Sequence, residues 1–169
     1  MIAYKFLRRD GASVFTHFRW PLPNGGPGPW VEAQVAPCRS GIHACRPSDL
    51  PLWVNDLLYE IELDGDIAEE PTKVVASRGR LFRRIDAWDD ELRASYTRMC
   101  ADRALKLAQS ASPPLADWAA VVEPSIPEGP ALLGFVAARI SEEISGTSAY
   151  DAERGRQADW LTQRLKLSR

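Results

Sequence analysis

The sequence predicts an α+β protein in which a mostly antiparallel sheet from the N-terminal half is covered by helices from the C-terminal half. Up to about residue 88, short segments alternate between apolar and polar residues, as half-buried strands do. From Asp89 onward, apolar residues recur at helical spacing. Strands grouped first and helices grouped afterwards are typical of α+β folds rather than of alternating α/β folds.

The chain length favours one domain. Its 169 residues, of which 45% are hydrophobic, are enough to bury a real core. A sheet needs a cover and the apolar faces of helices need a surface to pack on. We therefore predict a single domain over residues 1–169, made of a β-rich half (1–88) and a helical half (89–169).

The first elements are expected to form a hairpin followed by a long loop. Residues 4–8 alternate as a strand, Asp10-Gly11 is a turn signal, and 14–20 is rich in β-branched and aromatic residues. Proline, glycine and asparagine dominate 21–29, which excludes regular structure there. A strand is expected to resume at 30–35.

The stretch from Gly41 to Cys45 holds most of the unusual side chains. Because successive side chains of a strand point to opposite faces, Ile42 and Ala44 are expected on one face and His43 and Cys45 on the other.

A helix and three strands are expected to follow. Ser48 is placed as an N-cap for a short helix that reaches Leu57. Residues 59–63 alternate as a strand that a turn at Asp64-Gly65 would close. The remaining elements are two short strands on either side of Gly79 and, after Asp89, helices over 89–107, 115–122, 130–144 and from Ser148.

We expect a pocket near His43 and Cys45, beside the 21–29 loop. Long loops in compact domains are often functional. Trp20 and Trp30 flank this loop and are candidates, with His43, for contacting a ligand.

The sequence offers candidates for three kinds of chemistry. Cys38, His43, Cys45 and Cys100 offer zinc-type ligands, but their spacing does not match paired zinc motifs, so we expect no metal site. His43 and Cys45 are also candidates for a histidine–thiol catalytic pair, although i, i+2 side chains point in parallel rather than at each other.

A third candidate is a pair of carboxylates. Glu60 and Glu62 share the polar face of a strand and are candidates for acid/base catalysis, whereas a solvated face is the interpretation we favour.

Composition excludes several classes of partner. The formal net charge of -2 gives no electrostatic case for nucleic acid, and no apolar run is long enough for a membrane span. The N-terminus shows no secretory signal pattern. Three cysteines, an odd number, favour reduced thiols and a cytoplasmic location.

The first half resembles a group of uncharacterised bacterial and phage domains of unknown function. The resemblance rests on a first strand like 3–6, on the Gly-Ile-His-Ala-Cys segment 41–45, on the strand 59–63 and on Lys-Val-Val-Ala at 73–76. It covers about residues 1–88 and implies a shared domain without implying an activity. The strand, short helix and strand from Gly41 to Leu63 are similar, more weakly, to ADP-ribosyltransferase folds, which implies NAD binding.

The functional prediction is a cytoplasmic protein that binds a small molecule, with or without catalysis. The alternatives are a non-catalytic protein-interaction module and an ADP-ribosyltransferase-like NAD-binding protein. The sequence names no cofactor, reaction or oligomeric state.

Overall fold

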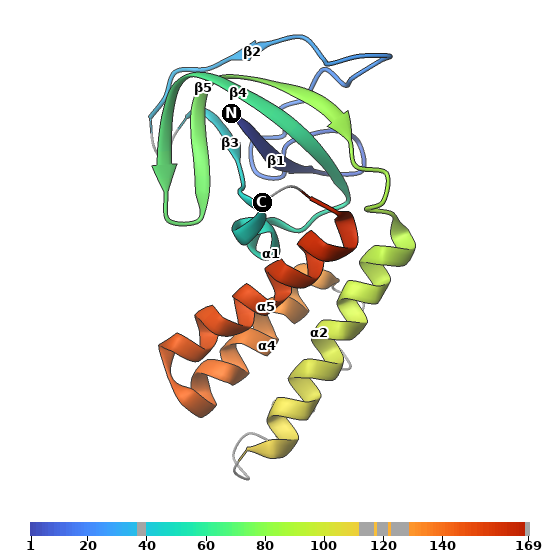
Figure 1. Cartoon of the computed structure of the whole chain (residues 1–169), viewed down its shortest axis with the longest axis vertical. Helices are drawn as coiled ribbons and strands as arrows, with labels where there is room; N and C mark the ends of the chain where they lie inside the picture. Colours follow the sequence, from blue (N-terminus) through green and yellow to red (C-terminus); the bar gives the residue numbers. More distant parts are fainter. Residues whose placement is uncertain (37–39, 112–116, 118–121, 123–128, 168–169) are drawn as a thin grey trace. The chain divides into compact units, whose positions relative to one another are not determined.

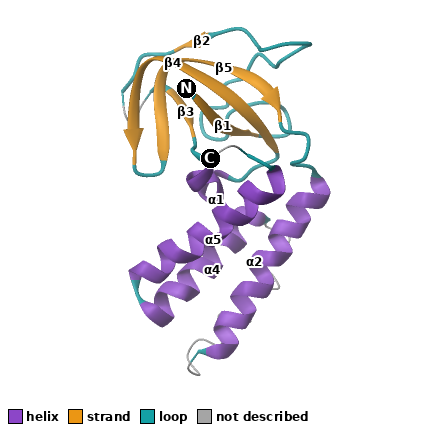
Figure 2. Ribbon diagram, viewed as in Figure 1, coloured by secondary structure: helices purple, strands orange, loops and turns teal. Residues whose placement is uncertain are grey.

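The computed structural model describes residues 1–36, 40–111, 117, 122 and 129–167 (Figure 1). The chain divides into two compact units, one from Met1 to Asp89 and one that begins at Asp90. The first unit holds the strands and the second holds long helices (Figure 2). The α+β class is therefore confirmed. The single domain and the helical cover over the sheet concern how the two units are joined, and they stay predictions.

The N-terminal unit is a five-stranded antiparallel sheet. A long hairpin of β4 (Leu57–Glu70) and β5 (Lys73–Arg84) forms its centre. The first half of β4 pairs with β1 (Ile2–Leu7), and β5 pairs on its other edge with two short strands. These are β2 (Val31–Glu32) and β3 (Ile42–Ala44).

The strands close into a ring. Tyr4 and Cys45 form an isolated bridge between the free edge of β1 and the end of β3, with both backbone N–H groups donating at 2.9 and 2.7 Å. The order β1, β4, β5, β3 thus returns to β1. Buried apolar side chains fill the core of this unit, among them Leu7, Trp20, Ile42, Ile61 and Leu81.

The turn predicted at Asp64-Gly65 is wrong, because β4 continues through it as a bulge. The pairing register with β5 shifts between Asp64 and Ile67. Gly65 has φ +73, and a Cβ there would lie 2.2 Å from the Ser77 hydroxyl oxygen. A left-handed glycine produces a bulge as readily as a turn, and the local sequence does not separate the two.

The two strands predicted around Gly79 are one continuous strand. Gly79 lies within β5 opposite Val31 and Leu63. A Cβ there would lie 2.9 Å from the Ile42 side chain. This glycine therefore allows a close approach across the sheet instead of making a turn.

The predicted hairpin of 4–8 with 14–20 is also wrong. β1 takes β4 as its partner, and 14–20 forms turns with one bridge between Ala12 and Arg19. Of the strand expected over 30–35, only β2 forms. The irregular 21–29 loop is confirmed.

The short helix is smaller than predicted. A 3₁₀ turn, η1 (Pro47–Asp49), leads into α1 (Leu50–Trp53), and β4 begins at Leu57. Ser48 lies inside η1 and the N-cap is Arg46. Pro47 and Pro51 occupy the first turns of η1 and α1, where proline is tolerated.

The second unit contains α2 (Asp90–Ser110), α4 (Pro130–Ser145) and α5 (Thr147–Leu165). Pro130 starts α4, as predicted, and Gly146, with φ +82, ends it. A buried Gln157 side chain on α5 donates to the Gly134 carbonyl on α4 at 3.0 Å. Most of the helix predicted at 115–122 lies outside the described residues.

Candidate functional site

The N-terminal unit contains a cleft of about 340 Å³. One wall comes from the sheet and includes Lys5 on β1, Ile42 and Ala44 on β3, and Val31 on β2. The other wall is the 13–20 segment, and Trp53 of α1 completes the lining. Its volume lies at the lower end of the range for small-molecule sites.

Local hydrogen bonds hold the 13–20 wall in shape. The Ser13 N–H donates to the Phe18 carbonyl at 2.8 Å, and the His17 N–H donates to the Ser13 carbonyl at 3.1 Å. The Trp20 indole N–H donates to the Ser13 hydroxyl at 2.8 Å. His17 has φ +55, a conformation that a non-glycine residue rarely adopts without support from its surroundings.

Aromatic side chains line the cleft although several are exposed. Phe15 is 77% exposed and makes an edge-to-face contact with Trp53, with ring centroids 6.1 Å apart. Phe18, 44% exposed, makes a similar contact with Trp20 at 5.5 Å. Exposed aromatic rings grouped around a concave site are typical of a binding surface.

Lys5 contributes a buried amine to the lining of the cleft. It lies between Ala3 and Leu7 on the core face of β1 and is buried. Its Nζ donates to the His43 carbonyl at 2.6 Å and lies 4.9 Å from the Trp20 ring centroid. Within the described part of the chain, Lys5 forms no salt bridge with a carboxylate.

The surroundings of Lys5 disfavour its charge. Burial lowers the pKa of Lys5 from 10.5 to about 8, and the opposing effect of Cys45 is smaller. Sequence reasoning missed this residue, because lysine in an alternating strand is normally assigned to the solvated face. The only signal was its place between two apolar residues of the same face.

His43 and Cys45 lie as strand alternation predicts. Ile42 and Ala44 belong to the core cluster, whereas His43 and Cys45 do not. His43 lines the cleft, and its backbone carbonyl is the atom that holds Lys5. Burial, and then the charge of Lys73, lower the pKa of the His43 imidazole. Its Nε2 is buried and has no hydrogen-bond partner among the described residues.

Cys45 is a buried neutral thiol. It is 2% exposed, and its Sγ donates to the Tyr4 carbonyl at 3.2 Å. Burial raises the pKa of this thiol strongly, and the Asp49 charge adds to the effect. Because the thiolate is the nucleophile, this environment suits packing rather than attack on a substrate.

Glu60 and Glu62 form cross-strand ion pairs and do not line the cleft. Glu60 pairs with Arg83, whose Nε–H donates at 2.7 Å, and Glu62 pairs with Arg80 at 2.7 Å. Their carboxylates are thus committed to guanidinium groups across the β4–β5 hairpin. The Glu60 and Glu62 side chains are 14% and 32% exposed, so this face of the sheet is polar but only partly solvated.

The two tryptophans proposed to contact a ligand occupy different places. Trp20 lines the cleft, as described above. Trp30 lies against the guanidinium groups of Arg78 and Arg80, 4.3 and 4.5 Å from its ring centroid, and does not line the cleft. The prediction that the 21–29 loop borders the pocket is wrong, because no residue of this loop lines the cleft. The 13–20 segment forms that wall instead.

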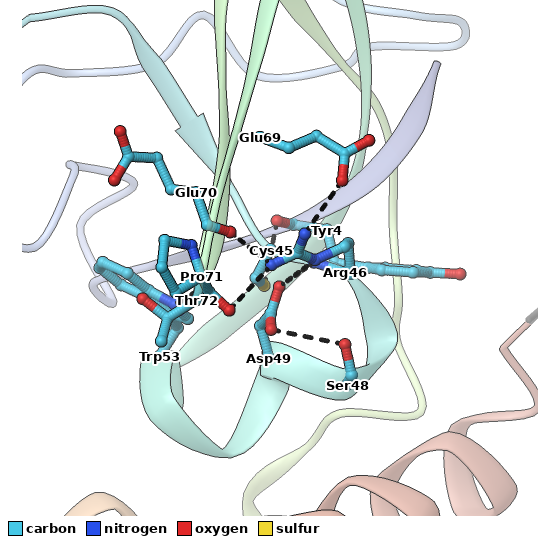
Figure 3. A network of polar contacts seen from close by, with 10 residues as sticks. All are labelled: Tyr4, Cys45, Arg46, Ser48, Asp49, Trp53, Glu69, Glu70, Pro71 and Thr72. Atoms are coloured by element: carbon cyan, nitrogen blue, oxygen red, sulfur yellow. Dashed lines mark hydrogen bonds and ion pairs between the residues drawn. The ribbon is translucent and has the colours of Figure 1, made fainter. Parts of the chain in front are cut away.

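A polar network holds α1 against the β4–β5 turn (Figure 3). Arg46 donates to the Asp49 carboxylate at 2.7 Å and to the Glu70 carbonyl at 2.7 Å. The Trp53 indole N–H donates to the Thr72 carbonyl at 2.7 Å. These bonds fix Trp53, which lines the cleft and contacts Phe15.

In the described ranges, no group of three or more His, Cys, Asp or Glu side chains is arranged to hold a metal ion. Cys38, one of the four candidate zinc ligands, lies outside these ranges. None of the described helices is both long and apolar enough to cross a bilayer.

Comparison with protein families, curated proteins and solved structures finds no match to this chain. The resemblances to domains of unknown function and to ADP-ribosyltransferase folds therefore stay predictions.

Proposed function

We propose that the chain binds a small aromatic molecule carrying an oxygen acceptor, in the cleft between the sheet and the 13–20 segment. The single observation that carries this proposal is a buried lysine without a carboxylate partner among the described residues, in a cleft lined by aromatic rings. A buried lysine without such a partner lowers the stability of the fold, and residues kept at a cost in stability are often functional.

The lining indicates the chemistry of the ligand. Phe15, Phe18, Trp20 and Trp53 offer ring faces and edges against which a flat apolar body packs favourably. Lys5 Nζ has three hydrogens when charged, and among the described residues it donates one hydrogen bond, to the His43 carbonyl. A ligand carbonyl or carboxylate oxygen would accept a second. The volume suits a substituted single or fused aromatic ring.

Two pairs of measurements test the proposal. The first is thermal shift of the whole chain with aromatic acids and aldehydes, compared with hydrocarbon analogues of the same shape. The second compares Phe15→Ala with Phe82→Ala, because Phe82 is an exposed phenylalanine of β5 outside the cleft.

We expect the oxygen-bearing ligands to raise Tm more than their analogues. Phe15→Ala should weaken binding by roughly three- to tenfold, the loss of one aromatic contact, while Phe82→Ala leaves it unchanged. Absence of binding by any compound, or equal effects of the two substitutions, would refute the proposal.

We also propose a reducing compartment such as the cytoplasm, since Cys45 and Cys100 are buried free thiols. The interaction module and the NAD-binding protein have no comparable observation in their favour within the described residues.

A further inference from the structure

Lys5 combines three features of a lysine that reacts with carbonyl groups: burial, a cleft large enough for a ligand, and no salt bridge among the described residues. We propose that Lys5 forms an imine with aldehyde or ketone ligands that enter this cleft. This inference rests on the proposed binding function, and it adds a covalent step and a substrate class to it.

The position of Nζ suits attack on a carbonyl carbon. Lys5 is held in β1 by its register with Tyr59 of β4, and its amine is fixed by the bond to the His43 carbonyl. A neutral amine can keep this bond, because it donates one N–H and retains its lone pair. The lone pair is then free for a ligand in the cleft.

Burial also supplies the reactive protonation state. With its pKa lowered to about 8, Lys5 is about half neutral at that pH. An exposed lysine with a pKa near 10.5 has a neutral fraction about a hundredfold smaller there. The Cys45 thiol and the His43 imidazole interact electrostatically with Lys5. Burial raises the pKa of the thiol and lowers that of the imidazole, so both are neutral at this pH.

The step balances without an external oxidant or reductant. The neutral amine attacks the carbonyl carbon, which forms a C–N bond and leaves a carbinolamine. The C–O bond then breaks, and the oxygen leaves as water with the two hydrogens that the amine contributed. The product is an imine between Lys5 and the ligand.

The experiment uses reductive trapping on the full chain. The protein is incubated with benzaldehyde and sodium cyanoborohydride at about pH 8, and peptide mass spectrometry locates the benzyl groups. The chain has four lysines, at positions 5, 73, 106 and 166, so the other three are internal controls. We expect Lys5 to be labelled first, with a rate that rises through a midpoint near its pKa of about 8.

Two variants and one competitor distinguish reaction of Lys5 inside the cleft from the general reactivity of lysine amines. Lys5→Arg keeps the charge and removes the nucleophile, so the early label should vanish, whereas Lys73→Arg should leave it intact. Benzyl alcohol, which has no carbonyl group, should protect Lys5 in the wild type. This last comparison needs no variant and remains valid if Lys5→Arg fails to fold.

The outcomes distinguish the two proposals. Labelling of Lys5 no faster than of the other lysines, while aromatic ligands still raise Tm, overturns the imine and leaves the binding function intact. If benzyl alcohol does not slow the labelling of Lys5, the inference is also overturned. The aldehyde would then reach the amine without entering the cleft that the alcohol occupies. Absence of both labelling and ligand binding overturns both proposals.

Discussion

Replacing Lys5 with methionine is expected to change stability by an amount that depends on pH. Methionine has a similar length and no charge, so it fills the same space without the cost of burying an ammonium group. Below about pH 8, Lys5 is protonated in the folded and the unfolded chain, and the wild type bears this cost in full.

Raising the pH relieves the cost in the wild type alone. Between pH 8 and 10.5 the unfolded chain binds a proton at Lys5 that the folded chain has lost, so wild-type stability rises with pH. A shift from 10.5 to about 8 corresponds to roughly 3 kcal/mol. The free energy of unfolding of Lys5→Met minus that of the wild type should therefore fall by roughly 3 kcal/mol between pH 8 and 10.5.

Urea unfolding of both proteins at a series of pH values measures this difference. The subtraction cancels the titration of every group that the two chains share. A difference that stays constant to within about 0.5 kcal/mol from pH 7 to 10.5 would refute the burial of a charged Lys5, since the extrapolation error is of that order.

Three further outcomes are expected. In a Cys38→Ser background, Cys45 and Cys100 should react with a thiol reagent only at the rate of unfolding, because both are buried and burial raises both pKa values; fast reaction of the folded chain would contradict this. His43→Gln should unfold at nearly the wild-type urea concentration, since the buried ring nitrogen has no described partner to lose; a loss above about 2 kcal/mol would reveal a hydrogen bond. Gly65→Ala should cost at least about 1 kcal/mol in the same assay, owing to its φ of +73 and the serine oxygen 2.2 Å from the added Cβ; unchanged stability would show that the bulge relaxes.

Much of the fold was predictable because its signals are local. The alternation of 59–63 identified the start of β4, and the helix predicted from residue 89 is α2, which begins at Asp90. The helix predicted over 130–144 is α4, which spans Pro130–Ser145. In each case a few neighbouring residues carry both the periodicity and the boundary, so no knowledge of distant contacts is needed.

The errors occurred where pairing partners are distant. Residues 14–20 have the composition of a strand, yet β1 pairs with β4 some fifty residues further along the chain. With that edge taken, 14–20 folds on itself and forms the cleft wall. Gly65 and Gly79 were both assigned to turns, because glycine alone does not tell a turn from a bulge or a close approach.

The candidate site shows the same division. The sequence by itself determined the class of fold and the opposite faces of Ile42 and His43. It also identified the 41–45 segment as the part of the chain near which a pocket was expected. Only the tertiary structure decided that Lys5 lies under Trp20 with its amine on the His43 carbonyl, 38 residues away. The reason is physical: periodicity assigns a side chain to a face, but burial and pKa depend on which distant segments cover that face.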